Sequence, residues 1–181
     1  MEIWDLYDEE RRLTGETMRR GDPIPEGYYH LVVHCAVFNG AGEMLIQHRQ
    51  PFKEGWSDLW DISMGGSAVA GDDSRSACAR EVREELGLEI DLAGVRPAMT
   101  LYFPGIIDDV YVIRREVDPA ALRCQPEEVS EARWAGEEEI LAMIADGRFI
   151  PYAPGFISFL FQWNRRPGTA HTRRDDTRPS L

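Results

Sequence analysis

Residues Gly66 to Leu88, GSAVAGDDSRSACAREVREELGL, predict a short helix with three glutamates on one face. At 100° per residue, Glu84 lies about 60° to one side of Glu81, and Glu85 lies about 40° to the other side. Two ionised carboxylates ~4 Å apart repel each other by ~4 kcal/mol at an effective dielectric constant near ~20. A hard divalent cation is the simplest partner for such a cluster.

The remainder of this segment predicts a helix that packs against a core. Three apolar residues follow the spacing i, i+3, i+7 on the side away from Glu84, namely Ala79, Val82 and Leu86. We therefore expect the acidic residues to point outward. Asp72 and Asp73 suit the positive end of the helix dipole, and Gly87 suits the C-terminal end of the helix.

The segment is similar to the Nudix box, G-x5-E-x7-R-E-U-x-E-E-x-G-U, in which U is a bulky aliphatic residue. Eight of the nine defined positions match: Gly66, Arg80, Glu81, Val82, Glu84, Glu85, Gly87 and Leu88. The one departure is Asp72, which is one methylene shorter than the usual glutamate and keeps its charge. A solvated acidic helix would explain the acids but not the flanking glycines and the arginine.

This resemblance implies a fold and a reaction. The fold is α/β, the Nudix fold, an α/β/α sandwich with a mixed β-sheet. The reaction is metal-dependent hydrolysis of a diphosphate linkage in a nucleoside diphosphate or a small molecule linked to one. By the same resemblance, Glu81 and Glu85 bind Mg²⁺ (Mn²⁺ as an alternative), and Glu84 is a further ligand or the base that deprotonates water. Arg80 orients the glutamates and pairs with Asp72.

Further candidates lie outside the helix. Arg49 ends the segment MLIQHR, where the family often has an arginine that contacts phosphate, although a surface salt bridge would also explain it. With Arg49, Gly65 and Gly66 are predicted to bind substrate, whereas Asp72 and Gly87 are structural positions of the box. Three glutamates are alternative bases or solvated surface acids, namely Glu127, Glu128 and Glu131. Four aromatic residues could stack on a base or line the pocket, with Trp60 favoured as core: Trp56, Trp60, Tyr102 and Phe103.

His30 and His34 are four residues apart in a predicted strand, so they share a face with Val32 between them. They could bind metal or be core histidines. Residues 1 to 150 resemble the isopentenyl diphosphate isomerase branch of the Nudix superfamily, in which His30 falls on a metal-binding histidine. However, the C-G-H motif of the isomerase falls on Met64, Gly65 and Gly66, and methionine has no proton to give an alkene. We therefore expect a hydrolase. A non-catalytic nucleotide-sensing module is the remaining alternative, and the presence of all three glutamates disfavours it.

The whole chain suits one globular domain. It has 181 residues, 43% of them hydrophobic, and no apolar run near the ~18 residues of a membrane span. We expect a Nudix domain over residues 1–163 and a disordered tail over residues 164–181. The start, MEIWDLYDEERR, is acidic where a signal peptide would be basic, so a cytoplasmic protein is expected. Three cysteines without metal-ligand spacing are predicted to be reduced, mostly structural thiols: Cys35, Cys78 and Cys124.

The charge of the chain bears on its partners. The net charge is −12, and the tail from Arg165 onward carries five arginines and two aspartates, so the rest carries about −15. Such a body repels a nucleic-acid backbone, but a bound metal would still allow a small phosphorylated substrate. We expect no nucleic-acid polymer and no membrane as partners, and a monomer or a homodimer.

The apolar patterns predict the other elements. Strands are expected at residues 28–38, 43–49, 99–103, 109–117 and 129–134, with a helix at residues 137–146 that stops at Gly147. A second helix, PGFISFLFQW, covers residues 154–163. Its core stripe is predicted to be Phe156, Phe159, Leu160 and Trp163, which follow i, i+3, i+4, i+7.

Overall fold

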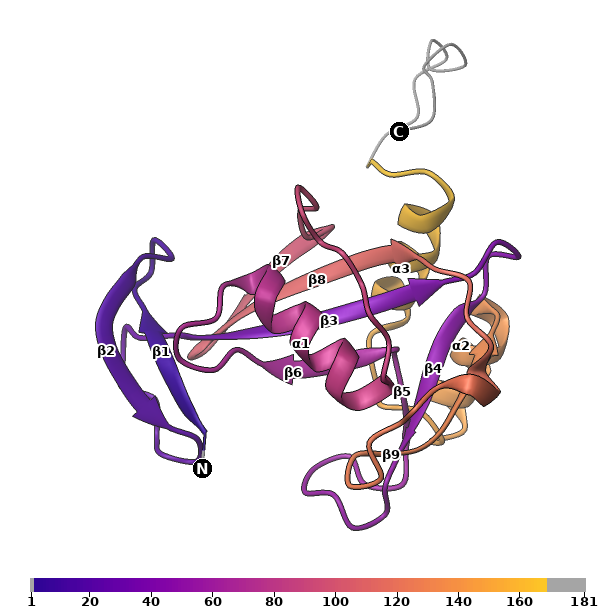
Figure 1. Ribbon diagram of the computed structural model, residues 1–181, viewed down its shortest axis with the longest axis horizontal. Helices are drawn as coiled ribbons and strands as arrows, with labels where there is room; N and C mark the ends of the chain where they lie inside the picture. Colours follow the sequence, from indigo (N-terminus) through magenta and orange to yellow (C-terminus); the bar gives the residue numbers. More distant parts are fainter. Residues whose placement is uncertain (1, 169–181) are drawn as a thin grey trace, which may run out of the picture.

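The structure is built on a mixed β-sheet with helices on both faces. The computed structural model describes residues 2–168. Within that range, seven strands form this sheet: β3 (His30–Phe38), β4 (Met44–Arg49), β5 (Trp60–Asp61), β6 (Met64–Ser67), β7 (Met99–Phe103), β8 (Ile106–Arg114) and β9 (Val129–Ala135). β3 pairs in parallel with β8, whereas β6, β7 and β9 pair with their neighbours in antiparallel fashion. The predicted α/β sandwich with a mixed sheet is confirmed (Figure 1).

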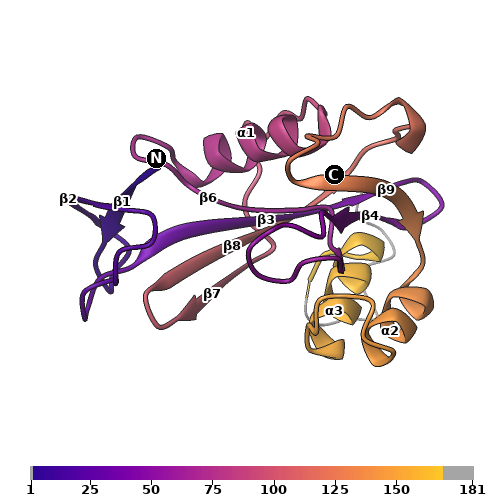
Figure 2. The same ribbon diagram turned by 90° about the horizontal axis from the view of Figure 1, so that it is seen from below.

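Helix α1 (Ser74–Leu86) covers one face of the sheet (Figure 2). The helix begins after Asp73, whose side chain accepts a hydrogen bond from the backbone N–H of Ser76 at 2.8 Å. It ends at Gly87, which takes the left-handed conformation with φ 64°. Its apolar side is buried against β3, and the fully buried positions are Ala77, Cys78, Val82 and Leu86. The predicted start, end and packing of this helix are therefore present.

Helices α2 (Glu137–Ala145) and α3 (Pro154–Arg165) cover the opposite face (Figure 2). The buried stripe of α3 is offset by one position from the prediction, and it consists of Ile157, Leu160, Phe161 and Asn164. Both sets of residues satisfy the spacing i, i+3, i+4, i+7. The second set was not predicted because it contains the polar residue Asn164. Asn164 is buried because Arg114 Nε donates to its Oδ1 at 2.8 Å, which satisfies the amide.

This contact also involves the last turn of α3, where the expected domain boundary lies. The boundary expected after Trp163 falls inside α3, which continues to Arg165. Arg114 further binds the backbone carbonyl of Asn164, so the last turn is tied to β8. The remainder of the predicted tail, residues 169–181, lies outside the described residues.

An N-terminal hairpin, β1 (Ile3–Tyr7) and β2 (Leu13–Arg19), is an element that the sequence patterns did not predict. It stands beside the end of the sheet where β3 begins (Figure 1). Arg11, in its turn, forms an ion pair with Asp109, whose side chain is fully buried. This ion pair joins two residues that are 98 positions apart in sequence. Together with the backbone hydrogen bonds between Tyr7 and Tyr29, it holds the hairpin against the domain.

Other differences concern strand ends and thiols. β8 spans Ile106–Arg114, so it starts three residues earlier than predicted and ends before Val117. Cys35 and Cys78 are buried free thiols, as expected, and Cys124 is partly buried. Within residues 2–168, no helix combines the length and the apolar character needed to cross a membrane.

Candidate active site

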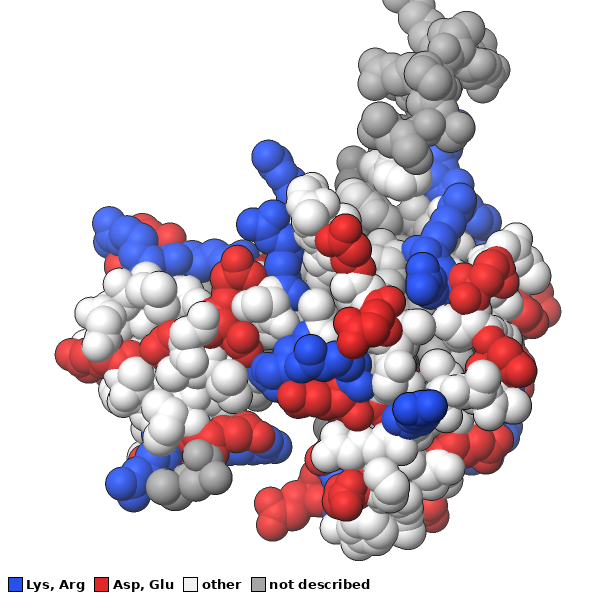
Figure 3. Space-filling view, viewed as in Figure 1, with Lys and Arg blue, Asp and Glu red and all other residues white. Residues whose placement is uncertain are grey.

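A cavity of about 610 Å³ opens beside α1, between the N-terminal hairpin and the rest of the domain. Three glutamates of α1 line one side: Glu81, Glu84 and Glu85. Three cationic side chains line it as well, from the residue after β2, from the end of β4 and from the loop after β4, namely Arg20, Arg49 and Lys53. Figure 3 shows the surface notched at this place, with acidic and basic side chains together along α1 and the hairpin. The cavity thus brings together acids that are close in sequence and cations that are not.

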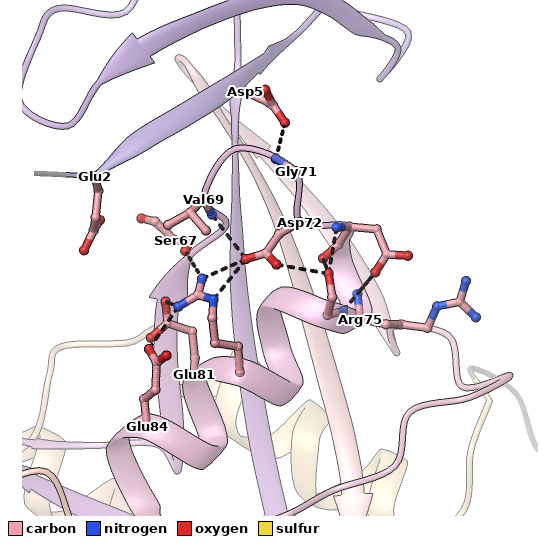
Figure 4. A network of polar contacts seen from close by, with 12 residues as sticks. Glu2, Asp5, Ser67, Val69, Gly71, Asp72, Arg75, Glu81 and Glu84 are labelled. Atoms are coloured by element: carbon pink, nitrogen blue, oxygen red, sulfur yellow. Dashed lines mark hydrogen bonds and ion pairs between the residues drawn. The ribbon is translucent and has the colours of Figure 1, made fainter.

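Arg80 connects the acidic residues at this end of α1 (Figure 4). Its Nε and Nη2 atoms donate to Asp72 Oδ2 at 3.0 and 2.9 Å, and Nη2 also donates to the carbonyl of Ser67 at 3.0 Å. Its Nη1 atom donates to Glu81 Oε1 at 3.0 Å and to Glu84 Oε2 at 3.1 Å. The expected pairing with Asp72 is therefore present. Because a shorter acid in the box still reaches Arg80, the departure from the usual glutamate does not break this network.

Two glycines of β6 allow close approach of functional side chains. A Cβ atom at Gly66 would lie 2.7 Å from Glu81 Cγ, and one at Gly65 would lie 2.7 Å from His34 Cδ2. Real Cβ atoms do not approach other atoms so closely, so any side chain here would displace its neighbour. Both glycines line the cavity, as a substrate-binding role requires. The structure gives them a reason that the sequence did not: they leave room for Glu81 and His34.

Glu85 contradicts the expectation that the acids of α1 point outward. It is 5% exposed, and Gln47 Nε2 donates to its Oε2 at 3.0 Å. Burial raises the pKa of Glu85 to about 8, although the hydrogen bond from Gln47 opposes this shift. Burial also raises the pKa of Glu81, partly offset by Arg80, whereas Glu84 is half exposed. The periodicity failed here because Glu85 borders the apolar stripe of the helix.

A second buried acid, Asp61, lies in the cavity and was not predicted. Tyr152 donates its hydroxyl to Asp61 Oδ1 at 2.8 Å, and Arg49 Nη1 lies 3.7 Å from Asp61 Oδ2. Burial raises the pKa of Asp61, while His34 and Tyr152 oppose the shift. Arg49 therefore lines the cavity and pairs with an internal acid, and its contact with phosphate stays a prediction. The sequence offered one local indication that Asp61 is buried, namely its position inside the apolar run LWDIS.

The two histidines of β3 have different surroundings. His34 lines the cavity, and its Nδ1 lies 2.8 Å from Asp108 Oδ1. Burial alone would lower the pKa of His34, but the carboxylates around it, with Asp108 foremost, outweigh burial and raise it. His30 stacks on Trp4 at 4.1 Å between ring centroids, and burial lowers the pKa of His30 to about 4. His30 is therefore packed against the hairpin.

The remaining candidates divide by position. Glu128 lines the cavity and forms an ion pair with Lys53, whereas Glu127 and Glu131 are exposed elsewhere. Among the aromatic residues, Trp56 and Phe103 line the cavity. Trp60 is partly buried, with the Arg133 guanidinium 4.7 Å from its ring, and Tyr102 makes an edge contact with Tyr29.

The donor set of α1 fits a hard divalent cation in its chemistry. Glu81, Glu84 and Glu85 supply only oxygen atoms, they line one cavity, and Gly66 leaves space beside Glu81. Within residues 2–168, however, no group of three His, Cys, Asp or Glu side chains is arranged to hold an ion. Arg80 engages two of the glutamates and Gln47 engages the third. A cation would therefore bind in exchange for some of these contacts.

Comparison with other proteins identifies the family. The sequence model of the NUDIX domain matches residues 28–153. The chain belongs to the Nudix family. An uncharacterized Nudix hydrolase from Listeria monocytogenes is 46% identical over 161 residues, which cover 89% of this chain and 94% of the relative. A crystal structure of a Deinococcus radiodurans protein has a TM-score of 0.69 and 25% identity, and covers 89% of this chain and 98% of that one.

The resemblance to the isomerase branch of the Nudix family is also confirmed. An isopentenyl-diphosphate Delta-isomerase from Citrobacter koseri is 27% identical over 147 residues, which cover 77% of this chain and 80% of the relative. The resemblance predicts that Met64 stands where the isomerases have the cysteine of their motif. Met64 is fully buried in the core cluster between the sheet and α1. This position therefore offers no proton donor to the cavity.

Proposed function

We propose that this protein is a metal-dependent hydrolase that cleaves a diphosphate linkage in a nucleoside diphosphate or in a small molecule linked to one. The observation that carries this proposal is the cavity, in which Glu81, Glu84 and Glu85 face the cations Arg49 and Lys53. Carboxylates suit Mg²⁺ or Mn²⁺, and cations suit phosphate oxygens. The volume of about 610 Å³ suits a small molecule.

Each side chain has a role in this proposal. Glu81 and Glu85 would hold Mg²⁺ or Mn²⁺, with Glu84 either as a further ligand or as the base, and the metal would withdraw charge from phosphorus and make the attacking water more acidic. Arg80 would position Glu81 and Glu84 through the hydrogen bonds that it already makes. Arg49 would contact a phosphate oxygen. Arg49 already forms an ion pair with Asp61, with 3.7 Å between Nη1 and Oδ2. A phosphate oxygen would bind Arg49 if it interacts more strongly than this carboxylate does.

The base that deprotonates water is proposed to be Glu84 or Glu128, the two base candidates that line the cavity. Glu84→Gln and Glu128→Gln test them, because loss of a general base lowers the rate by ~10²–10⁴-fold, whereas loss of a metal ligand at Glu84 would be relieved by a higher concentration of Mg²⁺. A variant with the rate of the parent excludes its residue from this role.

The deciding experiment is a panel of nucleoside diphosphates and nucleoside-diphosphate-linked compounds, assayed with Mg²⁺ for release of phosphate and of mononucleotide. We expect hydrolysis of at least one compound, loss of activity in excess chelator, and a rate that rises toward alkaline pH as ligands and water lose protons. The same panel includes isopentenyl diphosphate, followed for alkene isomerisation. Isomerisation without hydrolysis of any nucleotide would show that the hydrolase assignment is wrong.

A further inference from the structure

The loop between β4 and β5, residues 50–59, forms one wall of the cavity and is held at both ends; we call it the recognition loop. The backbone N–H of Arg49 donates to the carbonyl of Leu59 at 2.9 Å. Gln50 donates from its backbone to the carbonyl of Glu128 at 3.0 Å and from Nε2 to the carbonyl of Pro126 at 2.8 Å. The loop is therefore fixed against the strand that leads into it and against the segment before β9.

Trp56 is unusual within this loop. It lines the cavity, yet it is 55% exposed, and its φ of 51° is a left-handed conformation that costs energy in a residue other than glycine. Arg49 Nη2 donates to the carbonyl of the preceding Gly55 at 3.3 Å, which helps to hold this backbone. The exposed indole that lines the cavity can therefore serve as a stacking surface for a planar ligand.

Lys53 supplies a cation three residues before the indole. Its amino group pairs with Glu128 and lines the same cavity as Arg20 and Arg49. Burial lowers the pKa of Lys53, and the neighbouring cations Arg49 and Arg20 lower it further, whereas Glu85 opposes the shift. The ammonium group thus lies among like charges, with Glu128 as its direct counter-ion. A phosphate group would relieve this repulsion better than one carboxylate does.

We propose that the recognition loop binds a nucleoside diphosphate at two points, with the base stacked on Trp56 and the diphosphate bound by Lys53 after it leaves Glu128. This inference deepens the proposed function by assigning the residues that would select a nucleotide. A diphosphate without a base could use the cation alone. The two residues therefore predict a preference for substrates that combine a planar base with a diphosphate.

Binding of ADP and of isopentenyl diphosphate, measured by calorimetry in excess chelator, tests the base contact without catalysis. The parent should bind ADP more tightly. Trp56→Ala should weaken ADP binding by about 10-fold, within the range measured for base–aromatic stacking, and leave isopentenyl diphosphate unchanged. Phe52→Ala is the matched control, because Phe52 is 69% exposed on the same loop and does not line the cavity. Equal affinity of the parent for both ligands, or equal effects of the two alanine variants on ADP, would overturn the assignment.

Lys53 is tested with the same two ligands. Lys53→Gln should weaken both by a similar factor of about 10, and Lys53→Arg should restore most of the affinity because it keeps the charge. Unchanged binding by Lys53→Gln would refute its role. The binding results are separate from the hydrolysis panel: selective loss in Trp56→Ala with no turnover would overturn the hydrolase proposal and keep the nucleotide site. Turnover of nucleotides with unaffected binding in Trp56→Ala would keep the hydrolase proposal and overturn the assignment of the nucleotide site.

Discussion

Glu85→Gln distinguishes two effects of the buried carboxylate, namely its destabilisation of the folded protein and its proposed contribution to the catalytic rate. Glu85 is 5% exposed and accepts a hydrogen bond of 3.0 Å from Gln47. Glutamine has nearly the same size, and its side-chain oxygen can accept the same hydrogen bond. The substitution therefore removes the ionisable group while it leaves the packing of α1 nearly unchanged.

The size of the effect follows from the pKa of Glu85, which burial raises from 4.5 to about 8. An acid with a raised pKa in the folded state contributes no penalty below pH 4.5, where it is protonated in both states. Between pH 4.5 and about pH 8, the unfolded chain gains the charge and the folded chain does not, so stability falls by ~1.4 kcal/mol per pH unit. At pH 7 the free energy of unfolding of the parent should therefore be roughly 3 kcal/mol lower than that of Glu85→Gln.

The assay is thermal unfolding in excess chelator between pH 4 and pH 8, together with the rate at saturating Mg²⁺. Glu85→Gln should melt like the parent near pH 4 and roughly 6–12 °C higher near pH 7, since ~1 kcal/mol shifts the melting temperature of a domain this size by ~2–4 °C. Its rate should fall by ~10²-fold or more, because the charge that would hold the metal is gone. A variant that melts lower at pH 7 yet keeps most of its rate would show that Glu85 is a structural residue.

Substitutions at three further positions test two residues of the site and the end of α3. Gly66→Ala should lower the rate at least ~10-fold, because its Cβ would displace Glu81, whereas Gly136→Ala, with nothing within 4 Å, should not; equal rates would contradict the need for space. Asp72→Glu should keep the activity of the parent, and Asp72→Ala should lower it only modestly, because Arg80 still donates to Glu81 and to the carbonyl of Ser67. An Asp72→Ala variant without activity would show that Asp72 is a metal ligand. Asn164→Ala should lower stability by about 2 kcal/mol in a denaturant titration, and an unchanged midpoint would show that its contact with β8 is dispensable.

The parts of the fold that were predictable from sequence are those set by local signals. The start of α1 after Asp73 and its end at Gly87 depend on side-chain and backbone contacts within a few residues. The family box fixed which face of the helix carries the glutamates. The prediction from the apolar stripe that the acids point outward was wrong for Glu85, because its burial depends on Gln47 of β4, and the helix pattern contains no information about that strand.

Pairs that are distant in sequence explain most of what was missed. Asp108 and Asp109 are adjacent in β8, so they point to opposite faces of the sheet. Asp108 pairs with His34 in the cavity, and Asp109 pairs with Arg11 of the hairpin turn. Both partners are distant in sequence, so no local pattern shows that these two acids lie inside a strand. The same missing partner, Arg11, left the hairpin unpredicted.

The net charge of the chain does not describe the charge of its cavity. The chain carries a net charge of −12, yet its cavity gathers cations from three separate segments. Each of these cations has a carboxylate partner: Arg20 pairs with Glu2, Arg49 with Asp61, and Lys53 with Glu128. Under the proposed function, binding of a phosphorylated ligand would therefore be an exchange of counter-ions, in which a carboxylate is replaced by an anion of higher charge. This exchange needs no excess of positive charge on the surface. It also limits the affinity for a lone phosphate, because the carboxylates compete for the same cations, and so it favours a ligand that gains further binding energy from a second contact, such as the exposed ring of Trp56.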